Sequence, residues 1–282
     1  MLPAMNFPKF WAKGTHQQFT CWRWSDSSLA EAAAQAQEAA RRLAERFAAG
    51  EKLRHGYGYP DRPLREAVLR EIKAPGGEVA AVITRNSYGA LVLNTARIMF
   101  VDVDLPEPKS PVGGWLSKLF GKPEPSAASI TSDTVLAQAE AWNQSHPDWG
   151  WRVYRTKAGL RLLATHALFD PESASTEQVF DVLGADPLYR RLCRTQKCFR
   201  ARLTPKPWRC GFRNPPCRWP WPDAKAEARY KDWEYLYQKA CRDYATCDLT
   251  ATPGSQQIDP TVQLILKVHD ETTLANSKLA LA

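Results

Sequence analysis

Long hydrophobic segments are missing from this sequence. No run of about 18 consecutive residues is both apolar and uncharged, which argues against a transmembrane helix. The opening segment, "MLPAMNFPKFWAKG", also lacks the apolar stretch that secretory signals carry. We therefore expect a cytoplasmic protein with no membrane partner.

The sequence has few cysteines and histidines, and their spacing indicates neither a set of disulfides nor a histidine cluster. The 282 residues include seven cysteines at irregular spacings and five histidines that form no cluster. An odd number of irregular cysteines favours a reducing compartment over a set of disulfides. The sequence also has no Walker loop, no G-x-G-x-x-G turn and no nucleophile elbow, so none of these three common motifs of enzyme sites is present.

The composition is that of a soluble globular chain with a basic excess. Hydrophobic residues make up 44% and charged residues 24% of the chain, which is enough apolar material for a core. The formal net charge is +8. Such an excess is typical of proteins with an anionic partner, but it supports such a partner only once the basic residues are located.

Local patterns predict a mixture of helices and strands. We expect strands in the apolar segments of residues 78–104 and a hairpin at 148–166 around "KAG". Proline, glycine and serine mark residues 105–130 as a loop insertion, and the tail after residue 250 is expected to be loosely structured. This pattern predicts the α/β (α+β) class with a partly antiparallel sheet. Helices are expected at residues 27–50, 64–72, 132–146, 170–184 and 223–245.

The stretch "RIMFVDVD" ends an apolar strand with two carboxylates. Side chains two residues apart in a strand point to the same face, so Asp102 and Asp104 converge. Adjacent carboxylates repel unless they are protonated or bridged by a cation, and Mg²⁺ or Mn²⁺ prefers such oxygen ligands. Alternatively, the strand simply ends and both aspartates face solvent. Similar endings occur in glycosyltransferases, nucleotidyltransferases and nucleases.

The hairpin "TKAGLR" places polar and cationic side chains around a glycine turn. Thr156, Lys157 and Arg161 surround this turn, and such groups can hold a phosphate. The alternative is an ordinary hairpin with a solvated basic face.

A basic stretch runs from Arg190 to Arg218 without an acidic residue. Aromatic residues such as Phe199 and Trp208 are interleaved, which favours a surface for nucleic acid or polyphosphate over a merely solvated face. A lone acidic residue, Asp186, precedes it. The basic residues are Arg190, Arg191, Arg194, Lys197, Arg200, Arg202, Lys206, Arg209, Arg213 and Arg218.

Four cysteines in the same stretch raise the alternative of a zinc site. Their spacing lacks the close C-x₂-C pair of common zinc ribbons, so buried or free thiols are the favoured interpretation. The four are Cys193, Cys198, Cys210 and Cys217.

Taken in order, these segments resemble the archaeo-eukaryotic primase superfamily, which includes primase-polymerases and the polymerase domains of bacterial repair ligases. "IMFVDVD" resembles the first family motif, "TKAGLR" the second, and Asp186 in "GADPLY" the third. "FRARLTPK" is similar to a later segment with F-R and a downstream lysine. The resemblance spans about residues 80–210. It departs from the family at Arg161, where the family has a histidine that contacts the nucleotide's phosphates; arginine can also bind phosphate, but it does not titrate at neutral pH.

The resemblance implies a fold and a division of the chain. The core is expected to be primase-polymerase-like, with an RRM-like mixed or antiparallel sheet flanked by N- and C-terminal helices. The expected parts are an N-terminal helical accessory region at 1–75, a core at 76–222 that includes the insertion, and a C-terminal helix and tail at 223–282.

The resemblance also implies a two-metal nucleotidyltransferase that acts on DNA or RNA with nucleoside triphosphates. Asp102, Asp104 and Asp186 would hold two Mg²⁺ or Mn²⁺ ions, which activate a 3′-hydroxyl and steady the leaving pyrophosphate. The expected nucleotide ligands are Thr156, Lys157, Arg161, Arg200 and Lys206. The expected nucleic-acid ligands are Arg190, Arg191, Arg194, Lys197, Arg202 and Arg209.

Other functions remain open at this point. A catalytically inactive relative would bind nucleic acid without polymerising. A DxD-type metal-dependent transferase, such as a glycosyltransferase, would be favoured if the basic stretch pointed away from the aspartates. An interaction protein without an active site is the last alternative. The position of Asp186 relative to Asp102 and Asp104 is the observation that separates these possibilities best.

Overall fold

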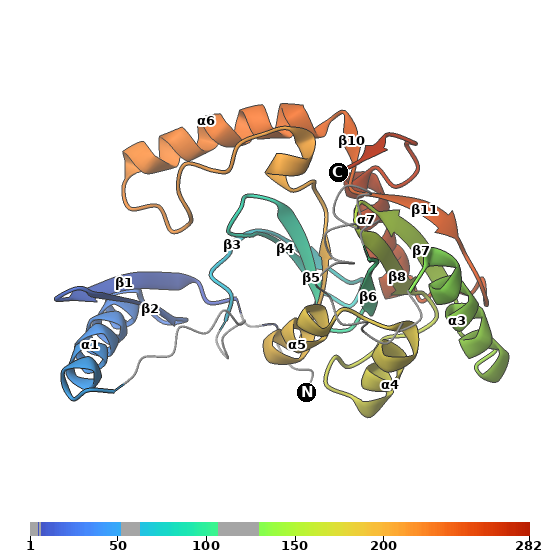
Figure 1. Cartoon of the computed structure of the whole chain (residues 1–282), viewed down its shortest axis with the longest axis horizontal. Helices are drawn as coiled ribbons and strands as arrows, with labels where there is room; N and C mark the ends of the chain where they lie inside the picture. The colour runs from blue at the N-terminus through green and yellow to red at the C-terminus, as the bar shows by residue number, and fades with distance from the viewer. Residues whose placement is uncertain (1–4, 6, 52–62, 107–129) are drawn as a thin grey trace, which may run out of the picture.

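The structure is a computed structural model, and it describes residues 5, 7–51, 63–106 and 130–282 (Figure 1). The described chain mixes α-helices with antiparallel sheets, so the predicted α+β class is confirmed. The expected loop at 105–130 and the turn-rich segment at 54–63 lie almost wholly outside the described residues. Among the described helices, none is long and apolar enough to cross a membrane.

Two four-stranded antiparallel sheets form the centre of the molecule. The first has the order β3-β4-β5-β9 and the second has the order β11-β7-β8-β6. The strands of the first sheet are β3 (Ala67–Lys73), β4 (Val79–Arg85), β5 (Leu91–Thr95) and β9 (Phe199–Arg202). Those of the second are β6 (Phe100–Asp104), β7 (Trp151–Thr156), β8 (Gly159–Ala164) and β11 (Cys247–Ala251).

Helices follow or connect these strands, and β10 (Tyr244–Ala245) pairs in parallel with β12 (Ala280–Leu281). The expected helices at 132–146, 170–184 and 223–245 are confirmed, each with shorter bounds. The described helices that follow β6 in the chain are α3 (Ser132–Ser145), α4 (Ala174–Leu183), α5 (Pro187–Gln196), the 3₁₀ turn η1 (Pro207–Cys210), α6 (Ala224–Cys241) and α7 (Pro260–Thr273).

One hydrophobic core joins the two sheets to the helices around them. Leu93 of β5 and Leu162 of β8 are both fully buried in it, together with Val135 of α3, Phe180 of α4 and Ile265 of α7. Burial of these apolar side chains is the main term that holds the sheets in a fixed relation. The two sheets that form the site described below are therefore held together by a packed hydrophobic core.

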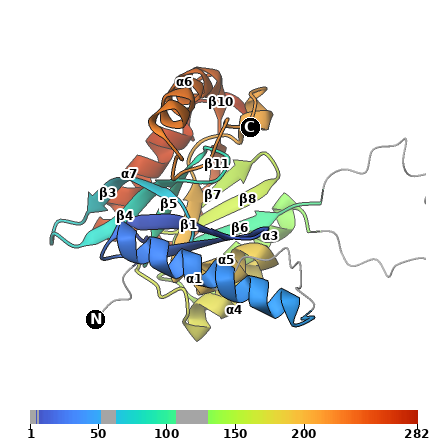
Figure 2. The ribbon, with the colours of Figure 1, turned by 90° about the vertical axis from the view of Figure 1, so that its left-hand side faces the viewer.

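The N-terminal part is a hairpin that packs on a helix. It consists of β1 (Phe10–His16), β2 (Phe19–Ser25) and α1 (Leu29–Ala48). The Ser28 hydroxyl caps α1 by accepting a hydrogen bond from the Glu31 backbone, as the predicted start of this helix requires. Figure 2 looks onto this side of the molecule and shows α1 and β1 in front of the sheets.

Two predictions about local structure are wrong. The segment 64–72, with its strong helix formers, is not a helix, because residues from Ala67 onward form β3 and pair with β4. The accessory region at 1–75 is thus not purely helical, and the division of the chain into three parts stays a prediction. The tail is not loose either: Asp259 caps α7, which buries His269 and several apolar residues. The helix signal at Asp259-Pro260 was present in the sequence.

The turn between β7 and β8 leads into the strand that carries Arg161, and this strand pairs with β6, which carries Asp102 and Asp104. Asp104 of β6 lies opposite Gly159 of β8, and Asp102 lies opposite Arg161. A Cβ atom on Gly159 would lie 2.0 Å from the carbonyl oxygen of Val103, which is too close for any side chain. Glycine is therefore required here because the two strands approach closely.

We predict that Gly159→Ala destabilises the fold by about 1–3 kcal/mol, because the added methyl group forces β6 and β8 apart. Urea unfolding followed by circular dichroism measures the change. Lys157→Ala is the matched control in the same turn, since Lys157 is exposed, and a surface change of this kind stays within about 0.5 kcal/mol. Equal stability of Gly159→Ala and the wild type would contradict the close approach of the two strands.

Candidate functional site

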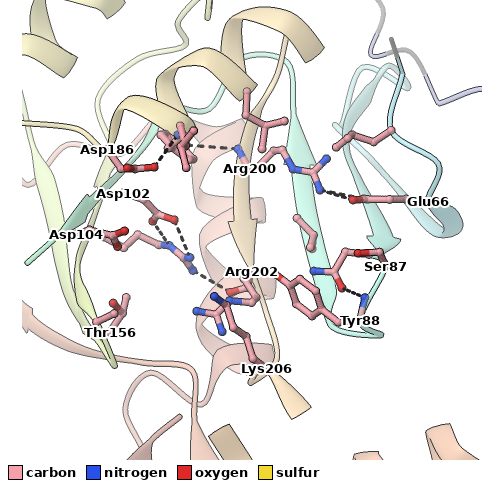
Figure 3. Close-up of a pocket in the computed structure, with 18 of the residues that line it drawn as sticks. Glu66, Ser87, Tyr88, Asp102, Asp104, Thr156, Asp186, Arg200, Arg202 and Lys206 are labelled. Carbon is pink, nitrogen blue, oxygen red and sulfur yellow. Dashed lines mark hydrogen bonds and ion pairs between the residues drawn. The ribbon is translucent and has the colours of Figure 1, made fainter. Parts of the chain in front are cut away.

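Asp102, Asp104 and Asp186 line one pocket of about 560 Å³ between the two sheets. Asp102 and Asp104 lie on the same face of β6, while Val101 and Val103 between and beside them point into the core. Figure 3 shows all three aspartates on one wall of this pocket.

Backbone hydrogen bonds fix the third aspartate beside the other two. The Asp186 amide donates to the carbonyl oxygen of Asp102 at 2.9 Å, and the Tyr189 hydroxyl donates to the carbonyl oxygen of Phe100 at 2.8 Å. Asp186 is also the N-cap of α5, where its Oδ2 atom accepts from the Tyr189 amide. Gly184, with φ of 68°, ends α4 and permits the short turn into α5.

The three carboxylates are close enough to affect one another. Burial, followed by the charges of Asp186 and Asp102, raises the pKa of Asp104. Lys206 and Arg209 act in the opposite direction but do not cancel the effect. In the described chain, no residue donates a hydrogen bond to the Asp104 carboxylate. A cation that bridged the carboxylates would relieve this repulsion.

Asp102 is bound to a buried arginine. Arg161 Nε donates to Asp102 Oδ1 at 2.9 Å, and Arg161 Nη1 donates to the carbonyl oxygen of Arg202 at 2.9 Å. The Arg161 side chain is only 2% exposed, compared with 32% for Asp102. Burial acts to lower the pKa of Arg161, but the Asp102 charge raises it above the ordinary value. Arg161 therefore has its strongest contacts with Asp102 and with β9.

A group of cations on and after β9 faces the same pocket. Arg202, Lys206 and Arg209 all line it, and within the part of the chain that the structure describes Arg202 Nη1 is buried without a hydrogen-bond partner. Burial lowers the pKa of Arg202, as do the charges of Arg161 and Arg209. Burial also lowers the pKa of Lys206, followed by the charges of Arg202 and Arg209. Mutually repelling cations with poor local compensation form a surface that an anion stabilises.

Most predicted nucleotide ligands reach the pocket, and one does not. Thr156, Arg161, Arg200 and Lys206 line it, whereas the exposed Lys157 lies outside its lining. The Thr156 hydroxyl accepts a hydrogen bond from the Gly159 amide, so it also supports the turn.

Arg200 forms an ion pair with Glu66, which also lines the pocket. Its Nη2 atom donates to both carboxylate oxygens of Glu66, at 2.8 and 2.9 Å, and both side chains are 8% exposed. The Thr84 hydroxyl donates to the same carboxylate. Among the described residues, Nη1 of Arg200 is buried without a hydrogen-bond partner, so this terminal nitrogen can still donate.

The predicted nucleic-acid cations divide into two groups. Arg202 and Arg209 line the pocket, and Arg191 is exposed on α5. The other three are neutralised, because α4 and the segment before it supply carboxylates that the local sequence of the basic stretch lacks. Their ion pairs are Arg190 with Glu177 and Asp181, Arg194 with Glu177, and Lys197 with Glu172.

The four cysteines of the suggested zinc site are divided between packing environments. Cys193 lies in the main core, whereas Cys210 and Cys217 belong to a separate cluster with α6. Burial raises the pKa of each thiol, including that of Cys198, which favours the unreactive protonated form. Within residues 5, 7–51, 63–106 and 130–282, no three His, Cys, Asp or Glu side chains are arranged to hold one metal ion.

Sequence reasoning missed the wall of the pocket that comes from the N-terminal half. Figure 3 shows Glu66, Ser87 and Tyr88 across from the aspartates. No local motif marked these positions, since each is contributed by a segment that turns or pairs next to β4. The missed lining residues are Trp11, Trp22, Pro63, Leu64, Arg65, Glu66, Asn86, Ser87 and Tyr88.

Comparisons of this chain with protein-family models, with curated proteins and with solved structures returned no match. The chain is an α+β protein whose pocket combines a carboxylate wall with a cationic wall.

We predict that Asp104→Asn raises the melting temperature at pH 7. Because the folded-state pKa of Asp104 is raised, the folded chain binds a proton more tightly than the unfolded chain, and the ionised carboxylate opposes folding. The gain in stability from the substitution is therefore largest at pH values above the folded-state pKa of Asp104. This gain disappears as the pH falls toward 3.8, the ordinary pKa of aspartate.

Thermal unfolding measured from about pH 4, near the ordinary pKa of aspartate, to about pH 8 tests this. Asp232→Asn, an exposed position on α6, is the matched control and should change little at any pH. An Asp104→Asn variant no more stable than the wild type at pH 7 would rule out the repulsion.

Proposed function

We propose that this chain is a metal-dependent nucleotidyltransferase of primase-polymerase type, which adds nucleotides from nucleoside triphosphates to DNA or RNA and releases pyrophosphate. The observation that carries the proposal is the shared pocket. Asp102, Asp104 and Asp186 lie on one wall, and the cations Lys206 and Arg202 lie on another (Figure 3). A triphosphate and its divalent cations need both kinds of wall at once.

The donor chemistry of the aspartates fits Mg²⁺ or Mn²⁺. All three supply hard carboxylate oxygens, and the pKa of Asp104 is raised by burial and then by the charges of Asp186 and Asp102, so a bound cation would stabilise its ionised form. Bound there, the ions would supply Lewis acidity at the attacking hydroxyl and at the leaving pyrophosphate. Loading would require the carboxylates to draw closer together, because no three of the described acidic side chains are placed as ligands of one ion.

The chain's own residues would position the substrate. Lys206, Arg202 and Arg209 would bind the phosphate oxygens, and Arg202 Nη1 is a buried donor that lacks any other partner. Arg161 would act on Asp102 by holding its carboxylate in place. Catalysis of this kind depends mainly on positioning and on electrostatic stabilisation.

The Arg161–Asp102 ion pair favours one alternative, a nucleic-acid-binding relative without catalytic activity. A permanent cation already neutralises Asp102 and competes with a metal ion for it. The glycosyltransferase alternative required a basic stretch that points away from the aspartates. Lys206 and Arg209 instead act on Asp104 electrostatically, so this observation supports a polyphosphate substrate.

We predict that the wild type extends a labelled primer with Mg²⁺ or Mn²⁺ and that Asp102→Ala, Asp104→Ala and Asp186→Ala each abolish extension. Removing a group that stabilises transition-state charge costs about 100-fold or more in rate. A gel-based extension assay with deoxynucleotides and with ribonucleotides measures the product.

Asp232→Ala is the matched control, an exposed aspartate outside the pocket lining, and it should retain full activity. Salt-sensitive binding of nucleic acid without any product, in either metal, would sink the polymerase proposal and leave the non-catalytic relative.

We predict that Lys206→Ala weakens binding of a nucleoside triphosphate by about 10-fold or more, as expected for loss of a charge-assisted contact. Isothermal titration calorimetry measures the affinity. Lys157→Ala, exposed and outside the pocket lining, is the control and should bind as the wild type does. Equal affinities of all three proteins would remove Lys206 from the proposed phosphate site.

A further inference from the structure

The β1–β2 hairpin has two faces of different chemistry. One face packs on α1 through small residues: a Cβ atom on Gly14 would lie 2.2 Å from the backbone of Ala36, and Ala12 clusters with Ala32 and Ala36. Residues alternate between the faces of a strand, so Trp11 and Lys13 belong to the other face. α1 therefore covers the small-residue face.

Tryptophans gather on the face away from α1. Trp11 pairs with Trp24 in the strand register, and Lys13 pairs with Trp22, so all four residues lie on the same side. The rings of Trp11 and Trp24 are 5.3 Å apart. The Trp22 ring lies 3.9 Å from the guanidinium carbon of Arg65, a cation–π contact. This face is aromatic and basic at once.

The aromatic face is continuous with the aspartate pocket. Trp11, Trp22 and Arg65 line the same pocket as the three aspartates. Arg65 directly precedes Glu66, which lies across the pocket from the aspartates in Figure 3. A chain that passes the carboxylates can therefore meet Trp22 without leaving the pocket.

The chemistry of this face selects one kind of ligand. Indole rings and guanidinium planes stack on nucleobases, while a lysine such as Lys13 attracts the phosphates between them. Inside a duplex both faces of a base are covered by the neighbouring base pairs, whereas an unpaired base in a single strand can turn a face to a side chain. The ligand is therefore single-stranded.

We propose that Trp22, together with Arg65, forms a base-stacking subsite for single-stranded DNA or RNA at the edge of the aspartate pocket. The inference rests on the proposed function, for which a template strand is the natural occupant. It adds the N-terminal hairpin, which carried no motif, to the nucleic-acid site.

Fluorescence anisotropy of a labelled oligothymidylate of about 16 nucleotides, without metal or nucleotide, tests the proposal on the full chain. Trp22→Ala should weaken binding by about 10-fold, the size of one lost base–aromatic stack, whereas Trp22→Phe should retain most of the affinity. Because stacking releases no counterions, the salt dependence of Trp22→Ala between about 50 and 200 mM should match that of the wild type.

Phe47→Ala is the matched control, since Phe47 packs on Phe19 at the α1 side of the same unit and lies outside the pocket lining. It should bind within about twofold of the wild type, the change expected at a neutral position. Wild-type affinity in Trp22→Ala overturns the subsite. Equal losses in Trp22→Ala and Trp22→Phe also overturn it, because phenylalanine keeps a stacking face.

The two proposals fail separately. A wild type that extends no primer but loses oligonucleotide binding with Trp22→Ala refutes the polymerase and supports the stacking subsite. A wild type that extends primers while Trp22→Ala binds normally refutes the subsite and leaves the proposed function standing.

Discussion

The ion pair between Asp102 and Arg161 is the contact on which the site is built. It joins β6 to β8 across a pair of opposed residues, and the same guanidinium reaches the backbone of β9 in the other sheet. A buried charge is tolerated only when it is paired and hydrogen-bonded, so this arginine adds a polar link between the two sheets to the hydrophobic core that holds them together. The pocket between them keeps its shape for the same reason.

Two charged groups in the pocket lack the close partners that several of its other charges have. Among the described residues, Arg190 pairs with Glu177 of α4, and within the pocket lining Arg200 pairs with Glu66 and Arg161 pairs with Asp102. Inside the pocket, Asp104 and the buried nitrogen of Arg202 remain without such contacts. Evolution commonly retains unpaired charges of both signs in one cavity where a ligand carries the complementary charges. A metal-bound polyphosphate meets this description.

Local signals in the sequence were sufficient for part of the fold and part of the site. The apolar run before Asp102 predicted β6, and the glycine turn predicted the β7–β8 hairpin. Interactions distant in sequence were not predictable. Glu66 and Arg200 are 134 positions apart, and pairing with β4 overrode the helical preference of residues 64–72. The ion pair of Arg190 with Glu177 could not be predicted from the basic stretch itself, because Glu177 lies on the preceding helix.

The backbone contacts of Asp186 have a consequence for solubility. β6 is an edge strand of its sheet, and an exposed edge is a template for pairing with another chain. The Asp186 amide and the Tyr189 hydroxyl occupy the carbonyl oxygens of Asp102 and Phe100, two positions apart on that edge. The start of α5 therefore both delivers the third carboxylate and shields the strand that carries the other two from edge-to-edge aggregation.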